Sequence, residues 1–164
     1  MHNPENYKTL FIALCQYLPF ELKGVVNVEA VDTNYVDMDG FYGETWFDAD
    51  VELIDINADT KEIYVISAED NEDLADYIQI CQTDGEPWTV DDFKPYLRPM
   101  SSMTEEEERE VRILWNEDFA DRVSLYHCYP RTTQFYCQHH LDYMGLIQAG
   151  IALEVKEGTY EEVH

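Results

Sequence analysis

Basic residues are scarce in this sequence. Ten Lys and Arg stand against 35 Asp and Glu, which gives the 164-residue chain a formal net charge of -25. Proteins that bind duplex DNA or anionic lipid directly do so largely through Lys and Arg that neutralise phosphates. We therefore expect no direct contact with nucleic acid or with a membrane, and we expect any charged partner to be a protein with a basic surface.

Long apolar runs are also missing. No stretch approaches the roughly 20 apolar residues that a membrane-spanning helix needs. The N-terminus, Met-His-Asn-Pro-Glu, lacks the basic and then apolar character of a signal peptide. We therefore expect a cytoplasmic protein. The four cysteines are then expected to be reduced thiols and not a disulfide framework.

The sequence motifs of common enzyme families are absent. The chain has no Gly-rich phosphate loop, no Gly-x-Ser-x-Gly and no His-Glu-x-x-His. It also has no internal repeat and no low-complexity tract. We therefore assign no catalytic residue and no cofactor-binding residue, and expect no cofactor.

The chain does have enough apolar side chains to fold. Its residues are 45% hydrophobic and 13% aromatic, whereas disordered acidic tails lack such side chains. The length suits one domain. We expect a single domain over residues 1–164, divided into a helix and β-meander (1–68), a helical half (69–153) and a loose tail (154–164).

The first 68 residues are expected to form one helix and three strands. Pro4 suits a first helical position, and apolar residues recur at helical spacing up to Leu18. The apolar period then changes to two in three runs, 25–31, 46–56 and 63–66. Residues 57–60 suit a hairpin turn, and residues 35–43 suit a longer loop. The pattern predicts an N-terminal helix packed on a three-stranded antiparallel meander.

Residues 69–153 are expected to be mainly helical. Helical spacing returns from Leu74 to Cys81, and two pairs have the capping-box pattern, Thr89 with Asp92 and Thr104 with Glu107. The second pair begins a helix that we expect to reach about residue 126, and residues 131–150 suit two short helices. Together with the meander, these elements predict an α+β fold.

Potential metal ligands are densest between His127 and His140. The candidates are Cys128, Cys137, His139 and His140. Zinc needs four N or S donors in a tetrahedral arrangement, and its ligands usually come in pairs with a gap of two to four residues, which this cluster lacks. The thiols could equally lie in the core, and the histidines could pair with carboxylates such as Asp142. A small metal-dependent or thiol enzyme built on residues 127–140 is therefore one alternative.

The acidic residues are spread over the whole chain. Residues 1–60 carry 12 acids and 2 bases, residues 61–100 carry 10 and 3, and residues 101–164 carry 13 and 5. One interpretation is an acidic soluble domain whose charge serves only solubility. The other is a nucleic-acid mimic, whose carboxylates imitate phosphates and occupy the basic groove of a nucleic-acid-binding protein.

Two segments carry a resemblance to other sequences. They are residues 95–107 (PYLRPMSSMTEEE) and residues 139–155 (HHLDYMGLIQAGIALEV). Both resemble recurring pieces of small phage and prophage proteins of Bacteroides-type gut bacteria, in which the second piece reads His-Phe-Asp-Tyr-Arg-Gly-Leu-Ile. Leu141 and Met144 depart from that pattern. The resemblance implies a phage or mobile-element protein in the cytosol of a bacterial host. It implies no particular biochemical activity.

These observations favour a non-enzymatic accessory protein that acts by binding another protein. The excess of acids predicts that the partner is basic, and nucleic-acid mimicry is one form that such binding could take. The enzyme built on residues 127–140 and the acidic domain without mimicry are the alternatives.

Overall fold

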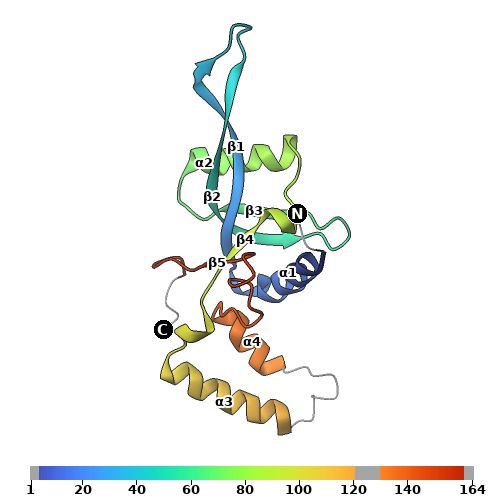
Figure 1. Ribbon diagram of the computed structural model, residues 1–164, viewed down its shortest axis with the longest axis vertical. Helices are drawn as coiled ribbons and strands as arrows, with labels where there is room; N and C mark the ends of the chain where they lie inside the picture. The colour runs from blue at the N-terminus through green and yellow to red at the C-terminus, as the bar shows by residue number, and fades with distance from the viewer. Residues whose placement is uncertain (1–3, 121–129, 161–164) are drawn as a thin grey trace.

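The computed structural model describes residues 4–120 and 130–160, and it places a five-stranded mixed sheet at the centre of an α+β fold (Figure 1). The strand order is β3-β2-β1-β4-β5. The neighbouring strands are antiparallel except β4 and β5, which are parallel. The strands are β1 (Lys23–Val36), β2 (Tyr42–Ile56), β3 (Ile63–Ser67), β4 (Lys94–Leu97) and β5 (Leu153–Glu154).

The sheet therefore has two more strands than the three that the sequence predicted. β1, β2 and β3 do form an antiparallel meander, but β4 joins β1 and brings β5 with it. β4 has four residues and β5 has two, which is too short for a period-two pattern to be visible. Pro95 within β4 and Pro99 after it have no N–H to donate to a strand ladder, which weakens the strand signal further. Part of the half that was expected to be helical thus completes the sheet.

The structure contains four described α-helices: α1 (Pro4–Tyr17), α2 (Glu72–Asp84), α3 (Glu105–Ala120) and α4 (Pro130–Gln138). Three 3-10 turns lie between them and the strands: η1 (Leu18–Phe20), η2 (Val90–Asp92) and η3 (Met100–Ser102). None of the described helices is long and apolar enough to cross a bilayer.

Both predicted capping boxes are confirmed. At η2, the Thr89 and Asp92 pair forms reciprocal side-chain to backbone bonds. At the start of α3, the Thr104 N–H donates to Glu107 Oε2 (2.9 Å) and the Glu107 N–H donates to Thr104 Oγ1 (3.2 Å). Each cap satisfies amides that the first turn of a helix leaves free. The expected continuation of α3 to residue 126 lies outside the described residues.

The prediction of two short helices in residues 131–150 was half wrong. α4 forms, but a series of turns follows it. The Asp142 carboxylate accepts from the amides of Leu146 (2.7 Å) and Ile147 (2.9 Å), and this pins the first of those turns. Gly150 has φ +76°, a left-handed conformation that closes the segment. A side chain that competes for backbone amides stabilises a turn in place of a helix.

One hydrophobic core joins α1 and α2 to the inward positions of β1, β2 and β3. It includes Leu14 and Tyr17 of α1, Ile78 of α2, and Val26 and Val51 of the central strands, each at most 2% exposed. The expected packing of the N-terminal helix on the meander is thus confirmed. The other face of β2 carries Asp48, Asp50 and Glu52 at the alternate positions.

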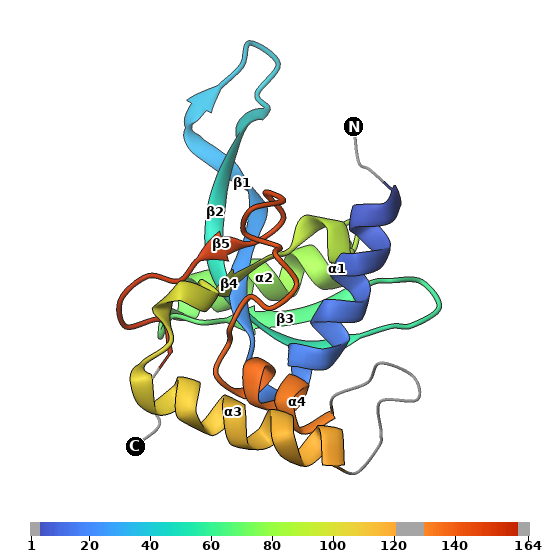
Figure 2. The same ribbon diagram turned by 60° about the horizontal axis from the view of Figure 1, so that its bottom comes forward.

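The hairpin of β1 and β2 continues well past the core as a two-stranded arm (Figures 1 and 2). We define the arm as residues 29–47; its pairs run from Glu29 opposite Trp46 to Val36 opposite Tyr42. The Asp37 carboxylate accepts from the amides of Asp39 (3.0 Å) and Phe41 (2.9 Å) and closes its turn. The loop expected over residues 35–43 is therefore shorter, because strands with no buried face carry little apolar alternation.

Residues 154–160, which the sequence assigns to a loose tail, are attached to the sheet. The Tyr160 hydroxyl accepts from the Lys23 N–H (3.0 Å) and donates to the Tyr96 carbonyl (2.9 Å). The His140 ring stacks on the Tyr160 ring, with centroids 3.6 Å apart. One aromatic residue thus holds a segment whose composition is otherwise polar.

Candidate functional site

Cys137, the first of the predicted metal or thiol residues, lies inside the core. It belongs to α4 and is 1% exposed. Burial raises the pKa of its thiol to about 11, although a hydrogen bond with Tyr143 lowers it slightly. A nucleophilic or metal-bound cysteine must be a thiolate. At neutral pH Cys137 is therefore a protonated core thiol, which is the alternative that the sequence left open.

The two neighbouring histidines turn toward other partners. His139 Nδ1 lies 3.4 Å from Glu107 Oε1, whereas His140 Nε2 donates to the Phe20 carbonyl at 2.6 Å. Burial lowers the pKa of His140. Within residues 4–120 and 130–160, no three His, Cys, Asp or Glu side chains are grouped so that they could hold a metal ion.

The rest of the predicted cluster lies outside the described residues. This applies to the candidate ligand Cys128 and to His127 beside it. The described candidates, Cys137, His139 and His140, point to three different neighbours. The geometry therefore gives no support to a metal or thiol centre built on those three.

The two segments that carry the phage-protein resemblance lie against each other. The Arg98 N–H donates to the His140 carbonyl (2.7 Å), and the Asp142 N–H donates to the Arg98 carbonyl (2.8 Å). The Arg98 guanidinium also holds both carboxylate oxygens of Glu107, at 2.9 Å each. The sequence left open a pairing of the histidines with Asp142, but the Asp142 carboxylate accepts from backbone amides, and the Tyr143 hydroxyl bonds to Gln16. These segments join β4, β5, α3 and α4.

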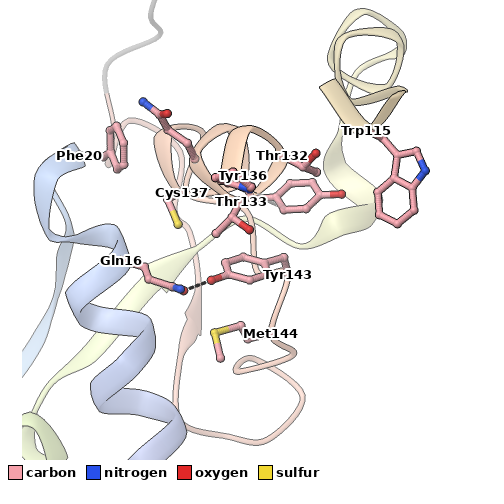
Figure 3. A pocket seen from close by; sticks show the side chains of 11 residues that line it. Gln16, Phe20, Trp115, Thr132, Thr133, Tyr136, Cys137, Tyr143 and Met144 are labelled. Carbon is pink, nitrogen blue, oxygen red and sulfur yellow. Dashed lines mark hydrogen bonds between the residues drawn. The ribbon is translucent and has the colours of Figure 1, made fainter. Parts of the chain in front are cut away.

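A cavity of about 660 Å³ opens between α1, α3, α4 and the turn at Tyr143 (Figure 3). The Tyr136 and Tyr143 rings stack at its wall, with centroids 5.5 Å apart, and the Tyr143 hydroxyl points at Gln16. Its lining residues are all uncharged: Gln16, Phe20, Trp115, Pro130, Thr132, Thr133, Gln134, Tyr136, Cys137, Tyr143 and Met144. The cavity has the size of a small-molecule site but offers no ionised group to such a molecule.

Large apolar side chains gather on the arm and face solvent. The exposed fraction is 70% for Phe41 and 59% for Trp46. Among the arm residues whose side chains the structure describes, the exposed apolar set is Val36, Met38, Phe41, Tyr42, Trp46 and Phe47. Contiguous exposed apolar side chains on a folded protein mark interaction sites. Aromatic residues are also enriched where proteins bind one another.

The same hairpin concentrates negative charge. Residues 24–60 contain ten Asp and Glu and no Lys or Arg. Partial desolvation and the neighbouring Glu44 carboxyl raise the pKa of Glu29, as expected where acidic groups crowd together. The arm therefore combines an aromatic surface with an uncompensated negative field, and we take it as the candidate functional site.

Reasoning from the sequence alone missed this site. The pattern predicted a loop over residues 35–43, in the middle of the arm, and the charge was compared only between segments of 40 residues or more. The signal was present as the stretch of residues 24–60 without a single basic residue. No known protein family, curated protein or solved structure matches the chain. The site therefore has to be interpreted from its own chemistry.

Proposed function

We propose that the chain is a non-enzymatic accessory protein of a phage or mobile element, and that it binds a basic protein of the host or the phage through the arm. The arm supports this proposal, because it projects from the core and carries exposed aromatic residues among acidic ones. The acidic residues attract a basic partner and speed the encounter. The aromatic residues supply the contact energy after the encounter.

A basic partner fits the arm better than a second copy of the chain does. Two copies would bring together surfaces that each carry part of a net charge of -25. Like charges that face each other across an interface cost several kcal/mol, an order-of-magnitude figure. A partner rich in Lys and Arg removes this penalty, and its cations can also lie over the exposed rings of Trp46 and Tyr42.

Nucleic-acid mimicry is the second candidate, favoured by a row of carboxylates along β2. Glu44, Asp48, Asp50 and Glu52 occupy even positions on one face of the strand, where successive even positions are roughly 6.6 Å apart. One DNA strand carries a charge about every 3.4 Å of axis, so the row is sparser. Asp50 is also engaged by the Tyr96 hydroxyl at 2.7 Å. Mimicry uses only the carboxylates, whereas binding of a basic protein uses both the carboxylates and the exposed aromatic residues of the arm.

The test compares the full chain with a variant that has a shortened arm. Replacing residues 31–44 by Asn-Gly keeps the Ala30 and Thr45 pair and closes it with a two-residue turn. The hairpin residues that the structure describes as fully buried, Val26, Val28 and Val51, lie outside the removed segment, so the variant should fold. Both chains are used as bait in lysate from a Bacteroides-type host. Bound proteins are identified, purified and titrated from low to high salt.

We expect the full chain to capture a basic protein and the shortened chain to lose it. The purified pair should dissociate as salt rises, because the attraction is screened. A variant with Ile113→Ser and Phe119→Ser on α3 is the matched control, since it removes exposed apolar surface away from the arm. Equal capture by the full and the shortened chain would contradict the proposal. Displacement of the partner by duplex DNA would favour mimicry.

A further inference from the structure

The outer edge of β2 is open along the arm. β3 pairs with β2 between Val51 and Ile56, and the Ala68 N–H adds one bond to the Asp50 carbonyl. Within the described residues, no strand pairs with β2 on that side between Tyr42 and Ala49. The ribbon views show the outer part of the arm standing clear of the other elements (Figures 1 and 2).

The direction of the free backbone groups follows from two hydrogen bonds. The Leu53 N–H donates to Leu22 on the β1 side, whereas the Asp50 carbonyl accepts from Ala68 on the outer side. Residues of an antiparallel strand alternate between its two edges, and the register with β1 has no shift between Gly43 and Glu52. Even-numbered residues therefore direct their N–H and C=O groups outward. Along the open edge, within the part of the register that has no shift, these are Glu44, Trp46 and Asp48.

We propose that a strand of the partner adds to this edge, in line with β3, and that the partner strand carries Lys or Arg. The inference rests on the proposed function and names the form that the binding takes. An exposed strand edge is a template for pairing, and proteins commonly close such edges. The chain does so at β3, where Gln82 donates to the Val65 carbonyl (2.9 Å) and accepts from the Val65 N–H (2.8 Å).

The side chains beside the open edge determine the chemistry of the added strand. Its outward side chains would lie next to Glu44, Trp46 and Asp48, which suit a cation by charge and by the face of the indole. Its other side chains would meet a hollow of about 330 Å³ between β2 and the start of α2. The hollow is lined by large apolar side chains and by acidic ones: Phe47, Leu74 and Tyr77, and Asp48, Asp50, Glu69 and Asp73. Apolar residues on that side of the added strand match the apolar part of the hollow, and the carboxylates add to the negative field that attracts the Lys or Arg of the strand. A second copy of the arm would place acid against acid.

The test uses a ten-residue peptide in which Lys and Val alternate, added to the full chain. Binding is followed by fluorescence anisotropy, and amide hydrogen exchange is followed by NMR. We expect the amides of Glu44, Trp46 and Asp48 to exchange at least about tenfold more slowly with peptide bound, because each gains a hydrogen bond. The amides of Thr45 and Phe47 already face β1 and should change little.

Two substitutions at one position separate charge from backbone pairing. Glu44→Gln removes the carboxylate, whereas Glu44→Pro also removes the outward N–H without breaking a bond to β1. We expect the Pro variant to bind the peptide about tenfold more weakly than the Gln variant, the ratio that one lost hydrogen bond produces. A peptide methylated at alternate backbone nitrogens should lose a similar factor.

Three outcomes would overturn the edge-pairing inference. They are equal affinity of the Gln and Pro variants, binding without protection of the even-numbered amides, and no binding of the peptide. Each leaves the proposed function standing if the shortened arm still loses the captured partner. Capture by the shortened arm would instead remove the proposed function, and the edge-pairing inference would fall with it.

Discussion

At the scale of single residues, Glu107 contacts residues from three separate segments of the chain, whereas its capping-box motif predicts only the contact with Thr104. Its carboxylate accepts from Arg98 Nη1 and Nη2 and from the Thr104 N–H, and it lies 3.4 Å from His139 Nδ1. The hydrogen bond from Arg98 lowers the pKa of Glu107, partial burial opposes it, and the Thr104 amide lowers it further. The ionised form is thus stabilised in the folded state.

Glu107→Gln is expected to lower the free energy of unfolding at pH 7 by about 1–2 kcal/mol, the value of a charge-assisted bond and a cap combined. Because the folded-state pKa lies below the ordinary 4.5, this stabilisation is present above pH 4.5 and is lost as pH falls through the folded value. Urea denaturation from pH 7 to pH 3 should therefore show the two chains converging. Glu106→Gln, on an exposed neighbour, is the control. A difference that stays constant with pH would contradict this account.

The contact of Glu107 with Thr104 could be predicted from the sequence, whereas its contacts with Arg98 and His139 could not. Thr104 and Glu107 are three residues apart, so their capping box is visible in the sequence. Arg98 and His139 reach the same carboxylate from β4 and from the end of α4. Their meeting depends on the backbone bridge between Arg98 and Leu141, which no local pattern encodes.

At the scale of elements, the outer edge of β3 is covered, whereas the outer edge of β2 along the arm is not. The Gln82 side chain of α2 closes the edge of β3 at Val65, while the edge of β2 along the arm stays open. A side-chain amide presents an N–H donor and a C=O acceptor, as a backbone peptide does. It can therefore occupy the free N–H and C=O of an edge residue and prevent a further strand from pairing there. The edge-pairing proposal accounts for this contrast.

Gln82→Leu is expected to destabilise the fold by about 1–2 kcal/mol, because Val65 loses both hydrogen bonds at a half-buried edge. The uncovered edge should also cause association that grows with protein concentration. Denaturant unfolding and multi-angle light scattering measure these two effects. Gln79→Leu adds the same apolar surface to an exposed position of α2 and should stay monodisperse. If both variants associate, the added apolar surface and not the uncovered edge causes the association.

At the scale of the whole molecule, the net charge of -25 should oppose folding and favour the binding of a basic partner that we propose. Repulsion among like charges destabilises the compact state, and salt screens that repulsion. Salt also screens the attraction between the arm and a basic partner. The same titration should therefore strengthen the fold while it weakens the complex.

The melting temperature is expected to rise by about 3 °C between low salt and 0.3 M sodium chloride, which corresponds to roughly 1 kcal/mol for a chain of this size. The rise should level off there, because the Debye length has fallen to roughly 6 Å. Differential scanning calorimetry of the partner-free chain measures it. A melting temperature that falls with salt would show that ion pairs outweigh the repulsion.

The sequence by itself determined the features that depend on neighbours along the chain. Both capping boxes, the start of α1 and the first three strands follow from spacing that a single element satisfies alone. The excess of acids, and therefore the expected sign of a partner, is likewise a property of composition.

Only the tertiary structure decided which distant residues meet. It added β4 and β5 to the sheet, directed Cys137, His139 and His140 to separate neighbours, and extended β1 and β2 into an exposed arm. Short strands and solvent-exposed strands gain their stability from pairing partners and not from a buried face, so they leave no periodic pattern. The candidate site lies where that pattern is absent.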